Sequence, residues 1–417
     1  MDVGTARHSK SNMSQLPSPD VFTRRSFLRV AAASSYQSSV SARDSDYREK
    51  LEDFNNYVPG HTPPPGMRQQ AEKMVFRRRE TPELEDAVVD QLRETIKDLQ
   101  NKGDEEVKNR LGAHVIPGYS TPSDERLDVV QGRLWYRAAP VPFKLSILDP
   151  PLPLPIPRPD TTFAFSKAAF TESQLRTMES LVQYPNGPSF ASPSPDVRFP
   201  FAVIEYKSQA EDGSIRVATN QAAGAGAVAL NGLLELMNRG PGLDASDVRQ
   251  PLFFSVVMDQ NSAYINMHWI GETSDTNEPT FHLEELRMLP LRYDDSIQVL
   301  QRALKNIHEY AAEDLLNIII DALDEYQDKK VKGWNKGLVR KRQAEAQPHA
   351  PPSSPPKPPP PPPPPPQSKK ARRAAPQTPK KATGLCAQRQ QAAQTPAETQ
   401  RSSVRTRRKT MPEDHPS

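Results

Sequence analysis

The sequence predicts an α/β domain that runs from about Pro82 to about Gly333 between two disordered arms. Within this stretch, amphipathic helical patterns alternate with short β-rich segments. The 45 prolines and a mean hydropathy of −0.71 indicate that much of the 417-residue chain cannot pack into a core. We therefore expect one folded core of roughly 250 residues.

The N-terminal segments divide at about residue 45. Residues 1–45 are rich in Ser, Arg and Pro without periodicity, which predicts a disordered arm. Residues 46–81 contain Tyr47, Leu51 and Phe54 at helical spacing, followed by a proline-rich break. We expect a short helix and linker there, and the pattern leaves open whether they dock on the domain or stay loose.

The first long helix has clear start and stop signals. Thr81 suits the N-cap, Pro82 suits the first helical position, and Gly103 ends the segment. The apolar stripe consists of Val88, Leu92, Ile96 and Leu99.

Short β-rich segments punctuated by prolines follow this helix. The predicted strands are Leu127–Val130, Leu134–Tyr136, Phe143–Leu148 and Thr161–Phe165. A helix is predicted over Lys167–Val182, and a loop over residues 184–195.

The second half of the domain has the strongest signals. Phe199–Lys207 reads as a central strand, and Arg216–Met237 reads as a long helix with small residues from Ala222 to Ala227 that permit close approach to a sheet. Leu252–Met258 and Ser262–Ile270 are typical of a β-hairpin. The last helix is expected from about Ser296 to Tyr326, within a domain that covers residues 82–333.

Residues 334–417 are expected to be a disordered, proline-rich and basic tail. The formal net charge is +3, but residues 340–417 hold about 16 Lys or Arg against about 4 Asp or Glu. This imbalance leaves the domain mildly acidic and makes the tail the expected contact for nucleic acid. The proline run from Pro358 to Pro366 predicts a polyproline II rod, which serves as a spacer or binds an SH3/WW-type partner.

Clustered basic residues in the tail resemble a bipartite nuclear localisation signal, which predicts an import receptor as partner and the nucleus, otherwise the cytoplasm, as location. The alternative is a solvated run of charge. The residues concerned are Lys369, Lys370, Arg372, Arg373, Lys380 and Lys381.

Composition also argues against several other classes of protein. Cys386 is the single cysteine, so no disulfide or cysteine-based zinc site can form within one chain. No run reaches the roughly 18 apolar residues of a membrane span, so we expect a soluble protein with no membrane partner. His268 and His282 have no ligand-spaced partners, and we interpret both as structural.

Two short elements carry residues suited to metal-dependent chemistry. Asp160 follows Pro159 before one predicted strand, while Glu205 and Lys207 lie on the next. Strand side chains alternate, so Glu205 and Lys207 are expected on one face. Two carboxylates suit Mg²⁺, and a lysine can hold or polarise a water molecule. The structural alternative is a turn residue at Asp160 and an ion pair between Glu205 and Lys207.

The order of helix, strands, Asp160, the Glu205 strand, helix and hairpin resembles the PD-(D/E)XK nuclease superfamily. Pro159-Asp160 resembles its first catalytic element, and Glu205-Tyr206-Lys207 resembles its E-x-K element. The chain is most similar there to uncharacterised fungal proteins with a PD-(D/E)XK nuclease-like domain. The likeness rests on Arg158-Pro159-Asp160, on Phe199-Pro200-Phe201 before Glu205, and on the helix segment from Asn220 to Ala227.

The resemblance implies a restriction-endonuclease-like mixed sheet flanked by helices, and a Mg²⁺-dependent nuclease or a descendant of one. Asp160 and Glu205 would bind metal, and Lys207 would position water. Glu85, with Glu83 as the second choice, and Gln221 are accessory candidates, although Glu85 also suits a helix N-terminus and Gln221 also suits solvent exposure. The other hypothesis is an inactive nuclease-fold protein that recruits partners or nucleic acid through its tail.

Overall fold

The computed structural model describes residues 40–79, 85–119, 123–211, 213–240, 250–273 and 276–346. The expectations for residues 1–39 and for the tail beyond residue 346, including the proline rod and the basic clusters, lie outside these residues. The same holds for Thr81, Pro82 and Glu83.

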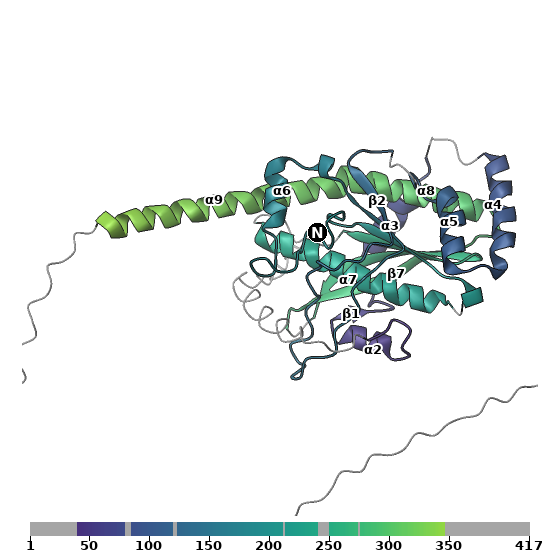
Figure 1. The fold of residues 1–417 in the computed structure, drawn as a ribbon, viewed down its shortest axis with the longest axis horizontal. Helices are drawn as coiled ribbons and strands as arrows, with labels where there is room; N and C mark the ends of the chain where they lie inside the picture. Colours follow the sequence, from purple (N-terminus) through teal and green to yellow (C-terminus); the bar gives the residue numbers. More distant parts are fainter. Residues whose placement is uncertain are drawn as a thin grey trace, which may run out of the picture. The chain divides into compact units, whose positions relative to one another are not determined.

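The described chain is an α/β structure built on one mixed sheet with helices on both sides (Figure 1). Its strands are β1 (Asn56–Tyr57), β2 (Leu127–Gln131), β3 (Thr161–Phe165), β4 (Ala202–Tyr206), β5 (Phe253–Met258), β6 (Ser262–Glu272) and β7 (Pro279–Pro290). In the described residues the sheet has seven strands in the order β1-β7-β6-β5-β4-β3-β2. The β1–β7 and β4–β5 pairs are parallel, and the others are antiparallel.

Eight α-helices are described along the chain. They are α2 (Tyr47–Glu52), α3 (Met67–Val75), α4 (Asp86–Asp98), α5 (Asp104–Val115), α6 (Glu172–Glu179), α7 (Ile215–Arg239), α8 (Asp294–Tyr310) and α9 (Leu316–Ala346). Short 3-10 turns are η1 (Leu99–Asn101), η2 (Lys167–Ala169) and η3 (Gln209–Glu211), and the π-helical turn η5 (Ala311–Leu315) joins α8 to α9.

The two faces of the sheet are covered by different helices. On one face, the Phe163 ring lies 4.6 Å from the ring of His308 in α8, and Phe254 lies 6.3 Å from Tyr310. On the other face, His268 of β6 packs against the backbone of Gly226 in α7. Figure 1 shows the sheet between α7 and the α8–α9 layer.

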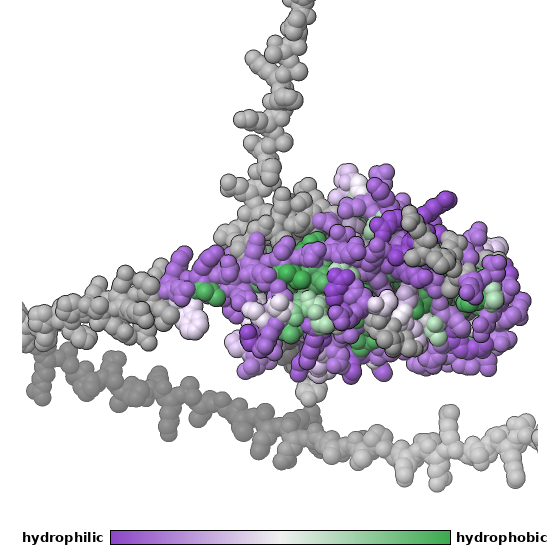
Figure 2. All heavy atoms as spheres, turned by 90° about the horizontal axis from the view of Figure 1, so that it is seen from above, coloured by the Kyte–Doolittle hydropathy of each residue, from purple (hydrophilic) through white to green (hydrophobic). Residues whose placement is uncertain are grey.

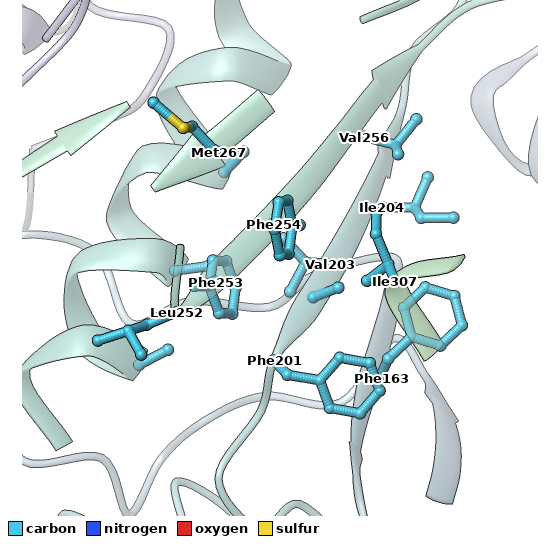
Figure 3. Packing of buried hydrophobic residues seen from close by; sticks show 14 of the residues in the cluster. Phe163, Phe201, Val203, Ile204, Leu252, Phe253, Phe254, Val256, Met267 and Ile307 are labelled. Carbon is cyan, nitrogen blue, oxygen red and sulfur yellow. The ribbon is translucent and has the colours of Figure 1, made fainter. Parts of the chain in front are cut away.

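The centre of the molecule is a continuous apolar cluster that joins the sheet to these helices. Figure 3 shows Phe163, Phe201 and Ile307 in this cluster, together with residues of β4 and β5. Fully buried side chains occupy every position of β3, β4 and β5. A strand buried on both faces reads as a continuous apolar run, and Phe201 to Ile204 has that pattern in the sequence.

Several predicted elements are confirmed. β3 spans the predicted residues, β2 and β4 lie within one to a few residues of theirs, and β5 and β6 form the expected antiparallel hairpin. α7 begins one residue before the predicted helix and ends two residues after it. The helix predicted over Lys167–Val182 is shorter, because Thr171 starts α6 with a capping box that includes Gln174.

Two predicted strands are wrong. Leu134–Tyr136 and Phe143–Leu148 do not join the sheet. Their backbone groups bond to loops instead, as the N–H of Trp135 does to the Pro157 carbonyl. Nearby prolines supply no N–H donors for a ladder, and Trp135 is anchored by complete burial of its side chain.

Four elements were not expected from the sequence: α3, α5, β1 and β7. β7 carries Glu284 and Glu285 in its middle and lacks a clean alternation, yet it pairs with both β6 and β1. The 46–81 segment packs on the domain, because β1 adds to the sheet and Tyr47 and Leu51 are buried.

The last helix continues beyond the expected domain end at Gly333 to Ala346. Trp334 on this extension is exposed, as is Val331 just before it. Figure 2 shows a face that is mostly hydrophilic, with hydrophobic residues in scattered groups.

None of the described helices is both long enough and apolar enough to cross a membrane.

Candidate functional site

The register of β3 and β4 brings Asp160 and Glu205 together. Thr161 pairs with Ile204, so the next step of this antiparallel ladder places Asp160 opposite Glu205. Asp160 Oδ2 accepts a hydrogen bond from the Tyr206 backbone N–H at 2.9 Å. Asp160 directly precedes β3, and Glu205 lies on the neighbouring strand β4.

Glu205 is a buried carboxylic acid in an unfavourable setting for negative charge. Glu205 is only 2% exposed to solvent. Burial, and then the neighbouring Asp160 carboxylate, raise the pKa of Glu205 well above its ordinary value, while Lys207, a hydrogen bond to the Asp160 backbone and Lys108 oppose this rise. Burial is therefore the main reason why the charged form of Glu205 is disfavoured.

Lys207 lies at the end of β4, where its N–H bonds to the Met258 carbonyl of β5. The residue is 7% exposed, and its Nζ donates to the Tyr206 carbonyl at 2.7 Å. Nζ also lies 3.8 Å from Oδ2 of Asp104. The lysine is thus held beside the carboxylates by two oxygen atoms.

Asp104 is the acidic residue that the sequence did not reveal. It starts α5, and its Oδ1 accepts a short hydrogen bond from the Ser208 backbone N–H. Burial raises the pKa of Asp104, opposed by Lys207 and by the bond from Ser208, while Glu211 and Asp160 raise it further. Asp104 therefore belongs to the same electrostatic cluster as Asp160 and Glu205.

The two accessory candidates belong to helices α4 and α7. Glu85 is exposed at the N-cap of α4, where its backbone carbonyl accepts bonds from Val88 and Val89. Gln221 is half-buried on α7, and its Oε1 has no hydrogen-bond partner among the described residues. Asp104, and not Glu85, is the helix acid that contacts Lys207.

Comparison with known families gives one match. Residues 91–323 match the family described as Domain of unknown function (DUF7924). The chain belongs to this family. No curated protein matches the chain.

The DUF7924 match contains α5 and strands β2 to β7, so it includes Asp104, Asp160, Glu205 and Lys207. Glu85 and β1 precede it. The candidate cluster is therefore part of the family domain, whereas the docked N-terminal segment precedes the matched residues.

The donor set of this DUF7924 site suits a hard divalent cation in chemical type. No group of three or more His, Cys, Asp or Glu among the described residues is arranged to hold a metal ion. Mg²⁺, however, commonly takes only one or two carboxylates and keeps several waters. Glu205 and Asp160 supply two such carboxylates, and burial together with the Asp160 charge raises the pKa of Glu205.

Asp104 could have been found from the sequence only through its position. It follows Gly103 and begins a run of acidic residues, which is typical of a helix N-terminus. That signal predicts α5 but not its contact with Lys207, which depends on packing between α5 and the end of β4.

Proposed function

We propose that this DUF7924 protein has a PD-(D/E)XK nuclease-like fold and hydrolyses phosphodiester bonds of DNA or RNA with a divalent cation such as Mg²⁺. The observation that carries the proposal is the convergence of Asp160, Glu205 and Lys207 at the ends of two neighbouring strands, with Asp104 beside them. This set combines acidic ligands with a buried cation, which is the chemistry that phosphodiester hydrolysis needs.

The chain order supports the fold part of the proposal. α4, with α5 after it, is followed by the antiparallel strands β2, β3 and β4, then by α7, and then by β5 parallel to β4. Asp160 precedes the second of these strands, Glu205 lies on the third, and Lys207 follows directly after it. This is the succession of elements on which the sequence resemblance to PD-(D/E)XK nucleases rests.

The roles follow from the contacts. Asp160 and Glu205 would hold the cation, which supplies charge neutralisation at the phosphate when bound. Lys207 would hold a water molecule beside them, and Asp104, whose Oδ2 lies 3.8 Å from Nζ, would orient the lysine. In hydrolysis the water oxygen forms a bond to phosphorus, the phosphorus–oxygen bond of the ester breaks, and the leaving oxygen gains a proton.

The direct test is cleavage by the full-length chain of labelled DNA and RNA in Mg²⁺ and in EDTA. Asp160→Asn, Glu205→Gln and Lys207→Met should each lower the rate by about 100-fold or more. Lys97→Met is the matched control, because Lys97 is exposed on α4 and pairs with Glu94. Cleavage that persists in EDTA, or in Glu205→Gln, would overturn the proposal.

One observation favours a non-catalytic alternative. Both carboxylates already bond to backbone groups of the opposing strand, so they also lengthen the β3–β4 ladder. We propose as the second candidate a protein that keeps this fold and binds nucleic acid or partners through its basic tail. Tight duplex binding by the full chain with no cleavage in Mg²⁺, Mn²⁺ or Ca²⁺ would favour it.

A further inference from the structure

Lys108 is a nearly buried cation that the proposed mechanism does not use. It lies one turn after Asp104 on α5, so both residues face the same side of the helix. Lys108 is 8% exposed. Within the described residues its ammonium group makes no hydrogen bond and no ion pair. Glu205 is close enough for Lys108 to lower its pKa, but a buried ammonium group that donates no hydrogen bond is costly, so its donors favour a further acceptor.

The ammonium group of Lys108 lies beside the turn that follows β2. A Cβ added at Gly132 would sit 3.8 Å from Lys108 Nζ. Gly132 has a φ of +54°, which favours glycine, and its N–H bonds to the Asp160 carbonyl at 2.9 Å. Lys108 therefore approaches the strand end that carries Asp160.

A second cation reaches the same glycine. The Nε of Arg158 donates to the Gly132 carbonyl at 3.1 Å, and the rest of this guanidinium is exposed. Arg158 forms no ion pair with the described residues. The glycine has no side chain that would fill the space next to Lys108. Lys108 and Arg158 thus flank a turn immediately next to the carboxylate cluster.

We infer that Lys108 and Arg158 bind a backbone phosphate of nucleic acid beside Gly132, next to the phosphodiester bond that is cut. The inference rests on the proposed function and adds a substrate contact to it. A phosphate oxygen accepts charge-assisted hydrogen bonds from both side chains, which gives the Lys108 ammonium group the acceptor that it lacks among the described residues. Phosphate contacts of this kind position a duplex without reading its sequence.

The acidic neighbours set a condition on this contact. Asp160, Glu205 and Asp104 repel a phosphate until a divalent cation neutralises part of their charge. Phosphate and cation therefore bind with positive coupling, and each should increase the affinity of the other by the same factor. Binding through the basic tail would not need the cation, so the coupling separates the two contributions.

The experiment measures the affinity of the full-length protein for a short DNA duplex across a salt series, in Ca²⁺ and in EDTA. Lys108→Met should weaken binding in Ca²⁺ by about tenfold. It should also reduce the slope of log affinity against log salt by about 0.9, the loss of one phosphate contact. Lys108→Arg should retain the slope, and Lys97→Met should match the wild-type protein. In EDTA the difference between wild type and Lys108→Met should shrink.

The outcomes separate this inference from the proposed function. If wild type cleaves DNA in Mg²⁺ and Lys108→Met matches its affinity and slope, the phosphate contact is overturned and the nuclease stands. If wild type does not cleave but the slope difference is present, the contact stands without catalysis. Should Lys108→Met fail to fold, Arg158→Met decides, because Arg158 is exposed and its loss also removes one contact; an unchanged slope there overturns the inference.

Discussion

Two glycines of α7, two residues apart, should respond in opposite ways to replacement by alanine. A Cβ at Gly224 would meet its nearest neighbour, the hydroxyl of Tyr47, at 3.6 Å, which is ordinary contact. A Cβ at Gly226 would lie 2.1 Å from Nδ1 of His268. His268 cannot move away easily, since it is 2% exposed and its Nε2 lies 2.8 Å from Ser255 Oγ.

The magnitudes follow from these contacts. Gly224→Ala should increase the free energy of unfolding by about 0.5–1 kcal/mol, because alanine loses less backbone entropy in a helix. Gly226→Ala makes the same gain but adds an overpacking cost of about 1–3 kcal/mol. It also strains the His268–Ser255 hydrogen bond, worth about 1 kcal/mol. The two variants should therefore differ by about 2–4 kcal/mol.

Urea unfolding followed by circular dichroism measures this difference, with calorimetry as a second readout. The midpoints of thermal unfolding should differ by about 4 °C or more. In the Gly226→Ala background, His268→Ala should recover part of the loss, since it removes the clashing ring. Equal stability of Gly224→Ala and Gly226→Ala would refute the close packing of α7 on β6.

Three further predictions test the site, the buried histidines and the tail. Glu205→Gln should raise the midpoint of thermal unfolding in EDTA at pH 7 by about 2 °C or more, because burial and Asp160 raise the pKa of this carboxyl and disfavour its charge. The variant should also lose the stabilisation that Mg²⁺ gives the wild-type protein. If Glu205 instead forms a structural ion pair, the thermal midpoint of the variant should fall. Burial lowers the pKa of His268 and of His282 to about 3 in the folded protein. As the pH falls below about 6.5, these histidines are protonated in the unfolded chain but not in the folded one, so the folded state loses stability as the pH decreases further. His268→Gln should reduce this loss by about 1.4 kcal/mol per pH unit between pH 6 and 5 in urea titrations, and an unchanged pH dependence would contradict the burial of a neutral imidazole. Deleting residues 347–417 should lower nuclear accumulation and the salt dependence of nucleic-acid binding while leaving the thermal midpoint nearly unchanged, and equal slopes for both chains would mean that the domain itself supplies the basic surface.

The candidate site was partly predictable because its residues lie on strongly patterned strands. Phe201 to Ile204 is continuously apolar, so Glu205 and Lys207 stood out as two charges on a buried strand. Asp160 stood out through its proline and the β-rich segment that follows it. Nothing local, however, sets the β3–β4 register that places Asp160 opposite Glu205.

The sequence did not single out three other residues near the site, which are Asp104, Lys108 and Gly132. Each reads as an ordinary surface or turn residue in the sequence, and the weak amphipathic pattern of α5 hid the helix itself. Their meeting with the ends of β3 and β4 depends on packing between segments that are far apart along the chain. The choice of Glu85 as the helix acid failed to find Asp104 for the same reason.

The sequence by itself determined the α/β class, the position of β3, the β5–β6 hairpin and α7, because hydrophobic periodicity, capping residues and turn residues act over a few neighbouring positions. Only the tertiary structure decided the edge of the sheet, where two-residue β1 pairs with β7, and the composition of the charged cluster. Strand pairing and the electrostatics of buried groups are long-range effects. Both depend on which distant segments pack together and exclude water, and a local sequence pattern does not predict that packing.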